Sequence, residues 1–235
     1  MIGLFSTKKW LIISPHADDA ELGCGGSISR AIENNIEVHI LVISIKGEWH
    51  SKDGVYVSSE TRLNELTGAM NEAGANLHVL NKTNDNESFD LCSSSKSKCV
   101  NEIDLLIGNI KPDVVFIPVP SFHQDHKWVY ECSIAATRTT KLSKYPISVL
   151  AYEYPPAGWG DSGSWSTTFG SVYVDISQHI EKKCSILAKH ESQMSTSDNS
   201  LISLDASKRL SSFRGLESGF NHAELFYLLR MRVDY

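Results

Sequence analysis

The sequence predicts a three-layer α/β fold, in which a mostly parallel central sheet carries helices on both of its faces. Short apolar segments rich in β-branched residues alternate along the chain with longer amphipathic segments, and this alternation is typical of a parallel sheet with crossover helices. The chain has 235 residues, 41% hydrophobic and 21% charged, as in an ordinary globular protein. No internal repeat and no linker rich in Pro, Gly or Ser divides it, so we expect a single domain over residues 1–235.

Strands are expected where apolar residues follow one another without polar interruption. These segments are 10–14, 37–44, 76–80, 113–118, 147–153 and 171–176. Several are too continuously apolar to have a face in water, as in the buried strands of parallel sheets. Helical spacing of apolar residues predicts helices over 20–34, 58–74, 98–110 and 126–141, then over about 178–194 and 201–212, with a last apolar segment at 222–233.

Charge and composition exclude several classes of function. The chain has 22 Lys and Arg against 28 Asp and Glu, a net charge of −6, without a basic cluster, which argues against nucleic-acid binding. No apolar run approaches the ~20 residues of a membrane helix, and the N-terminal run is too short for the core of a signal peptide, roughly 7–15 residues. The five cysteines include no C-x-x-C pair, as expected of free thiols in a reducing compartment. We therefore expect a cytoplasmic protein without an integral membrane segment.

Two polar clusters follow predicted strands, PHADDAE at 15–21 and PSFHQDH at 120–126. Ligands of open α/β sheets bind beyond the carboxyl ends of the strands, so both clusters lie where a site is expected. His16 and Asp19 are three residues apart at the start of a helix and can point the same way. With His126 they would offer two nitrogens and one oxygen, leaving a fourth position for water, which is the arrangement of a catalytic zinc site.

Asp18 would then point away from the metal and be free to take a proton from that water. A plainer interpretation is that Asp18 or Asp19 only caps the following helix, as Asp often does. The presence of two clusters at one edge of the sheet favours the metal site.

The same residues resemble a known family. HADDAELGCGG (16–26) is similar to the H-P-D-D-x-E signature of the PIG-L/LmbE-like zinc-dependent N-deacetylases, with Ala17 in place of the usual Pro, and HQDH (123–126) is similar to their H-x-D-H motif. Further landmarks occur in the family's order. They are KGE (46–48), Arg62 with Glu65 and Ala69, YVDIS (173–177), Lys183 with Leu187, HESQ (190–193) and AELF (223–226).

The resemblance implies a Rossmann-like fold and one Zn²⁺ per chain, with another divalent metal left open. The family's metal ligands match His16, Asp19 and His126. Its general base matches Asp18, and the histidine that steadies the oxyanion or protonates the leaving amine matches His123. Asp125 takes the place of the carboxylate that orients a histidine, a usual arrangement around metal ligands.

Four further residues are expected at the substrate. Glu48 and Arg62 match family positions near it, although Arg62 could equally pair with Glu60 or Glu65 on its own helix. His190 lies in the HESQ motif. It could line or support the substrate pocket, or it could simply be a packed core residue.

The loop 154–170 contains Trp159, Trp165 and Phe169. It is long for an irregular connection, and such loops are usually functional or disordered. We expect it to be an active-site loop, with Trp159 at the substrate.

The resemblance implies removal of the acetyl group from an N-acetylated sugar or N-acetylglucosaminyl conjugate. Two alternatives remain: a zinc amidase or esterase with another acyl substrate, and a non-catalytic sugar-binding protein on the same scaffold. The family's metal ligands, general base and oxyanion histidine all have a matching residue in this chain. This favours the enzyme. The expected partner is the sugar substrate, with a homo-oligomer left open.

Overall fold

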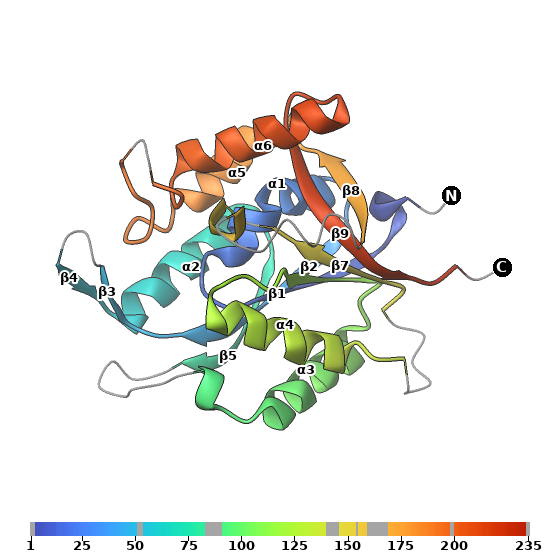
Figure 1. Cartoon of the computed structure of the whole chain (residues 1–235), viewed down its shortest axis with the longest axis horizontal. Helices are drawn as coiled ribbons and strands as arrows, with labels where there is room; N and C mark the ends of the chain where they lie inside the picture. The colour runs from blue at the N-terminus through green and yellow to red at the C-terminus, as the bar shows by residue number, and fades with distance from the viewer. Residues whose placement is uncertain are drawn as a thin grey trace.

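The computed structural model describes residues 3–50, 54–82, 91–139, 146–153, 155–158, 169–197 and 200–233. Its main sheet has the strand order β5-β2-β1-β6-β7-β9-β8 (Figure 1). The strands are β1 (Lys9–Ser14), β2 (Glu37–Ile45), β5 (Asn76–Lys82), β6 (Val114–Pro118), β7 (Ser148–Tyr152), β8 (Gly170–Asp175) and β9 (Ala223–Met231). The first five of these run parallel, whereas β9 is antiparallel to both β7 and β8. The predicted mostly parallel sheet is confirmed.

All six predicted strands are present, with small differences at their ends. The apolar segment 222–233 forms β9, which lies between β7 and β8 in the sheet. A separate antiparallel hairpin of β3 (Glu48–His50) and β4 (Val55–Val57) follows β2. The sequence does not predict this hairpin, because each of its strands is too short to show an apolar period.

The helices are α1 (Asp19–Glu33), α2 (Ser59–Ala73), α3 (Lys96–Ile110), α4 (Gln124–Ala136), α5 (Ile180–Leu187) and α6 (Leu204–Ser218), with short 3-10 turns η1 (Leu4–Ser6), η2 (Leu91–Ser93) and η3 (Pro155–Gly158). The helix expected over 178–194 is the main difference, since α5 ends at Leu187. Beyond it, His190 and Ser192 point their polar groups at Glu21 and Glu65. Such side-chain bonds compete with continuation of a helix.

The two faces of the sheet bury separate apolar clusters. Trp10 and Ile12 of β1 pack with residues of α1, α2 and α5, whereas Leu11 and Ile13 pack with residues of α3 and α4. All four side chains are fully buried. Figure 1 shows the two groups of helices on opposite sides of the sheet. The three layers expected from the alternating segments are therefore present.

Glycines in α1 allow the helix to approach the sheet closely. A Cβ atom on Gly23 would collide with the Tyr152 ring of β7, and one on Gly26 would lie 2.7 Å from Ile176 Cδ1. These glycines therefore allow α1 to pack closely against its neighbours. Within the described part of the chain, no helix has the length and apolarity needed to cross a membrane.

Candidate active site

The candidate site lies at the carboxyl ends of β1 and β6. These neighbouring strands pair in parallel, and the chain leaves β1 toward α1 and β6 toward α4. On one side of β1 the sheet continues to β2 and on the other to β6. This is the topological switch point at which open α/β sheets bind their ligands. The structure therefore brings together the two polar clusters that are about a hundred residues apart in the sequence.

Asp19 connects the two histidines predicted to bind a metal. Its Oδ2 atom lies 3.1 Å from His16 Nδ1 and 3.2 Å from His126 Nε2. The candidate ligand atoms of these three residues all lie within 4.8 Å of one another. Asp19 and His126 are 4% and 1% exposed. Burial alone would raise the pKa of Asp19, but the two imidazoles hold it well below its ordinary value, so a charged carboxylate faces two nitrogen donors.

Two imidazole nitrogens and one carboxylate oxygen form a donor set that suits zinc and other first-row metals. The chemistry and spacing of these side chains therefore fit a divalent metal.

Asp125 contacts the other side of His16. Its Oδ2 lies 3.0 Å from His16 Nε2, and Lys46 Nζ is 4.0 Å from the same oxygen. The Cys92 thiol donates to Oδ1 over 3.6 Å. Burial lowers the pKa of His16, but its bonds to Asp125 and Asp19 outweigh that effect and raise the pKa to about 9. Asp125 thus fixes the orientation of the imidazole that faces Asp19.

His123 stands at the N-terminus of α4 with its ring beside the other two. Its ring centroid is 5.0 Å from that of His16 and 5.2 Å from that of His126. Its Nδ1 accepts the backbone N–H of Asp125, so a neutral imidazole carries its proton on Nε2. Partial burial and the other two histidines lower the pKa of His123. The residue therefore offers a neutral N–H donor on the exposed side of the site.

Asp18 immediately precedes α1, yet its side chain makes no capping hydrogen bond. Ser14 Oγ instead accepts the N–H of Ala20 at 3.1 Å. Asp19 also faces away from a cap, toward His16. Asp18 is 6% exposed, and its burial, together with the charge of Asp19, raises its pKa. The geometry does not support the plainer interpretation of Asp18 and Asp19 as helix caps.

Arg62 is buried on α2 and fixes the segment after β2. Its Nη1 donates to the carbonyl of Lys46 at 3.1 Å and lies 3.4 Å from Glu48 Oε1. The alternative partner Glu65 accepts hydrogen bonds from Ser192 instead. Arg62 is 3% exposed, and its charge also acts on Asp18, whose pKa it lowers against the larger effect of burial.

His190 has no exposed surface and lies behind the site. Its Nε2 is 3.1 Å from Glu21 Oε1, and Glu21 belongs to α1, two residues after Asp19. Trp159 and most of the predicted loop 154–170 lie outside the described residues.

A buried ion pair supports α1. Lys183 Nζ donates to Glu224 Oε1 at 2.7 Å and to the carbonyl of Leu22 at 2.8 Å. Glu224 in turn accepts the backbone N–H groups of Gly26 and Ser27. Both charged side chains are 3% exposed. Lys183 and Glu224, the latter part of the AELF segment, therefore hold α1 in place.

Sequence reasoning missed the contacts that Lys46 and Cys92 make with Asp125. Lys46 begins the KGE segment. That motif indicates that Lys46 lies near the site, but it does not indicate that Asp125 is its partner. Cys92 lies on η2, far from both clusters in the sequence, and nothing in the sequence points to it.

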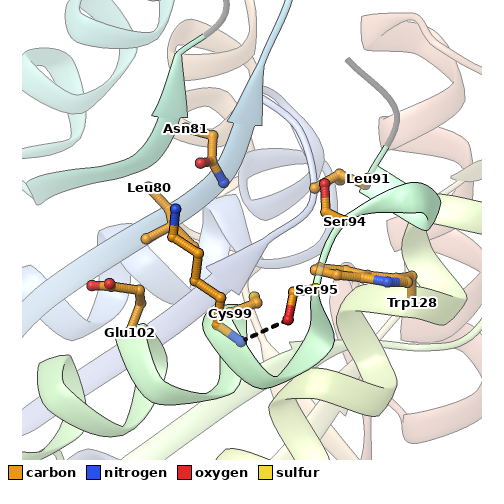
Figure 2. Close-up of a pocket in the computed structure, with 9 residues that line it drawn as sticks. Leu80, Asn81, Leu91, Ser94, Ser95, Cys99, Glu102 and Trp128 are labelled. Atoms are coloured by element: carbon orange, nitrogen blue, oxygen red, sulfur yellow. Dashed lines mark hydrogen bonds between the residues drawn. The ribbon is translucent and has the colours of Figure 1, made fainter.

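A cavity of about 410 Å³ is bordered by β5, η2, α3 and α4 (Figure 2). It is lined by Leu80, Asn81, Leu91, Ser94, Ser95, Lys98, Cys99, Glu102 and Trp128. None of the predicted site residues is among them.

The fold and the site define a class of protein: an α/β protein with a His/Asp set suited to a metal at the switch point of its sheet. The family model of PIG-L, described as GlcNAc-PI de-N-acetylase, matches residues 11–137, more than half of the chain and both polar clusters. The chain belongs to the PIG-L family. It is therefore a hydrolase of the N-deacetylase class, as the sequence predicted, and deacetylases of this family are metalloenzymes.

Individual relatives agree with this assignment. The chain is 27% identical over 190 residues to a diacetylchitobiose deacetylase of Thermococcus kodakarensis, covering 79% of this chain and 70% of the relative. It is 26% identical over 198 residues to the uncharacterized deacetylase YaiS of Escherichia coli, covering 79% of this chain and 91% of the relative.

Solved structures share the fold at lower identity. An N,N'-diacetylchitobiose deacetylase from Pyrococcus horikoshii superposes with a TM-score of 0.75 at 18% identity, covering 97% of this chain and 86% of that one. A 4-carboxy-2-hydroxymuconate hydratase, GalB of a Pseudomonas, superposes with a TM-score of 0.69 at 17% identity, covering 97% and 98%. A hydratase therefore shares this fold, so structural similarity alone does not specify the reaction.

Proposed function

We propose that this protein is a zinc-dependent hydrolase that removes the acetyl group from an N-acetylated sugar or N-acetylglucosaminyl conjugate. The observation that carries the proposal is the sharing of Asp19 between His16 and His126, with the buried carboxyl of Asp18 next to them in the chain. The names of the relatives support the sugar, since two of them are deacetylases of diacetylchitobiose.

The metal would be held by His16, Asp19 and His126. When bound, zinc lowers the pKa of a water molecule toward ~7 and polarises a carbonyl group. Asp125 keeps the His16 ring in the orientation that turns Nδ1 toward Asp19.

Asp18 is proposed as the general base. It takes a proton from the attacking water and passes it to the departing amine, which requires a carboxyl group whose pKa lies closer to the working pH than usual. Its burial and the neighbouring Asp19 raise its pKa in that direction. A charged carboxylate at Asp19 and a more basic one at Asp18 would divide metal binding and proton transfer between two adjacent residues.

His123 is proposed to stabilise the tetrahedral oxyanion. Its Nδ1 accepts a backbone N–H, so its Nε2–H is left to donate to the oxygen on which negative charge develops. A donor that is already oriented needs no rearrangement during the reaction.

Substrate contacts are assigned to the residues around this centre. The Glu48 side chain is 39% exposed and would accept hydrogen bonds from sugar hydroxyl groups, while Arg62 fixes Glu48. His190 would act through Glu21, by holding α1 in position. Trp159 remains a prediction for the loop after β7.

An acyl-substrate screen tests the proposal. Acetate release is measured for N-acetyl sugars, for nucleotide sugars and N-acetylglucosaminyl conjugates, for an acyl amide without a sugar and for an acetyl ester. Chelator-sensitive release from an N-acetyl sugar is expected. Faster turnover of the sugar-free amide or the ester would replace the proposal by the amidase or esterase, and binding of N-acetyl sugar without any acetate release would replace it by the sugar-binding protein.

A further inference from the structure

The hairpin of β3 and β4 stands beside the candidate site. It follows β2, whose end contacts the first polar cluster, since the N–H of Ser44 donates to the carbonyl of Pro15 at 3.1 Å. Figure 1 shows the hairpin projecting beyond the sheet next to α2. Two residues, Lys46 and Gly47, connect the end of β2 to the first strand of the hairpin, which begins at Glu48.

Trp49 and Tyr56 form an exposed aromatic pair on this hairpin. They face each other across the two strands, with ring centroids 5.6 Å apart and ring planes at 59°. Trp49 is 71% exposed and Tyr56 is 37% exposed. A large apolar side chain exposed to this extent calls for an explanation when a second one lies against it.

Contacts of the neighbouring residues fix this pair relative to the site. Alternate residues of a strand point to opposite faces, so Glu48 turns toward Arg62 while Trp49 turns to the open face of the hairpin. Lys46 reaches Asp125 over 4.0 Å, and Arg62 holds both the Lys46 carbonyl and Glu48. Trp49 thus directly follows a segment, Lys46 to Glu48, that contacts Asp125 at its first residue and Arg62 at both ends.

We infer that Trp49 and Tyr56 form a second sugar subsite, which binds the sugar next to the one that is deacetylated. A pyranose ring presents a face of C–H groups, which packs on an aromatic ring, and a rim of hydroxyl groups, which need polar partners. An exposed indole packed against a tyrosine supplies the first, and the rim of a sugar bound on this open face of the hairpin keeps its hydroxyl groups in contact with water. The inference rests on the proposed function and narrows its substrate to an oligosaccharide or glycoconjugate of at least two sugars.

The test compares one sugar with two and three. The ratio of kcat/KM for the β-linked di- and trisaccharides of N-acetylglucosamine to that for the monosaccharide is measured in wild type and in Trp49→Ala. We expect the ratio to fall about tenfold, mainly through KM for the longer substrates, because removal of a central aromatic contact commonly costs binding on this scale. An unchanged ratio would overturn the subsite.

Matched variants distinguish the effect of the Trp49 ring from an effect of hairpin stability. Trp49→Phe retains a ring and should keep most of the preference for longer substrates, whereas Trp49→Leu retains apolar bulk only and should lose it. Val55→Ala removes another exposed side chain of the same hairpin and should leave the ratio unchanged. Equal losses in Trp49→Leu and Val55→Ala would mean that only hairpin stability is involved.

Binding distinguishes failure of the subsite from failure of the proposed function. Calorimetric titration of the disaccharide into Asp18→Asn, with and without Trp49→Leu, measures affinity without turnover. Binding that weakens with Trp49→Leu supports the subsite even if wild type releases no acetate. If wild type releases acetate from all three sugars but Trp49→Leu does not change the affinity for the disaccharide, the subsite is overturned and the proposed deacetylase activity still stands.

Discussion

The Nε2 atom of His16 lies 3.0 Å from Oδ2 of Asp125, on the side of the ring opposite to Nδ1. The carboxylate of Asp125 is 2% exposed, so this contact is held within the protein. A ligand histidine whose second nitrogen is fixed in this way presents its first nitrogen in one tautomer and one orientation.

Asp125→Asn should weaken metal binding without abolishing it. Loss of such a partner typically costs about 10–100-fold in metal affinity. Competition with a chelator of known affinity measures the change. Asp205→Asn, which removes an exposed carboxylate paired with Arg209 on α6, is the matched control and should bind metal as wild type does.

Metal binding should release a proton from His16 at neutral pH. Its pKa is raised to about 9 in the metal-free protein, so the imidazole is protonated below that pH and must lose the proton to bind a metal. Apparent affinity should therefore rise with pH up to about 9. Calorimetry in buffers of different ionisation enthalpy counts the protons released, and an enthalpy that does not depend on the buffer would contradict this reading of His16.

Asp18→Asn should retain the metal and the fold but lower turnover by about 10²–10⁴, the usual contribution of a general base. The amide is nearly the same size as the carboxyl group and cannot accept the proton. Metal content and steady-state kinetics are measured on the same preparation. Near-normal turnover would remove Asp18 from the mechanism, whereas loss of the metal would make it a ligand.

Lys183→Met should strongly destabilise the protein, because Glu224 would remain buried without its partner. Breaking a buried pair from one side costs about 3–5 kcal/mol. Lys208→Met, which breaks the exposed pair with Glu181, should cost less than about 1 kcal/mol. Denaturant unfolding of both variants gives the comparison. Similar losses in the two would show that the buried pair does not secure α1.

Much of the fold follows from apolar patterning, and the exceptions have physical causes. Strand β1 was predicted because Leu11, Ile12 and Ile13 are consecutive and apolar, and the structure buries them on both faces of the sheet. The hairpin was missed because its strands are three residues long. The expected helix over 178–194 ends at Leu187 because side chains beyond it bond across space, which no local pattern records.

The candidate site, too, is only partly predictable from the sequence. His16 and Asp19 could be paired from their spacing, and the end of the neighbouring strand brings in His126. The pairing of Arg62 with Glu48 could not be chosen over Glu65, since a sequence does not show which helix face meets the segment after β2. Cys92 reaches Asp125 only through tertiary packing.

Titration of zinc into chelator-treated protein, with acetate release from an N-acetyl sugar measured at each step, tests the central claim most directly. Acetate release should be absent without metal, rise linearly and level off at about one equivalent of zinc per chain. The described residues offer two sets of two histidines and a carboxylate, His16 with Asp19 and His126 and His16 with His123 and Asp125, and both sets use His16. Full acetate release by the metal-free protein, or none at any zinc concentration from any N-acetyl sugar, would contradict it.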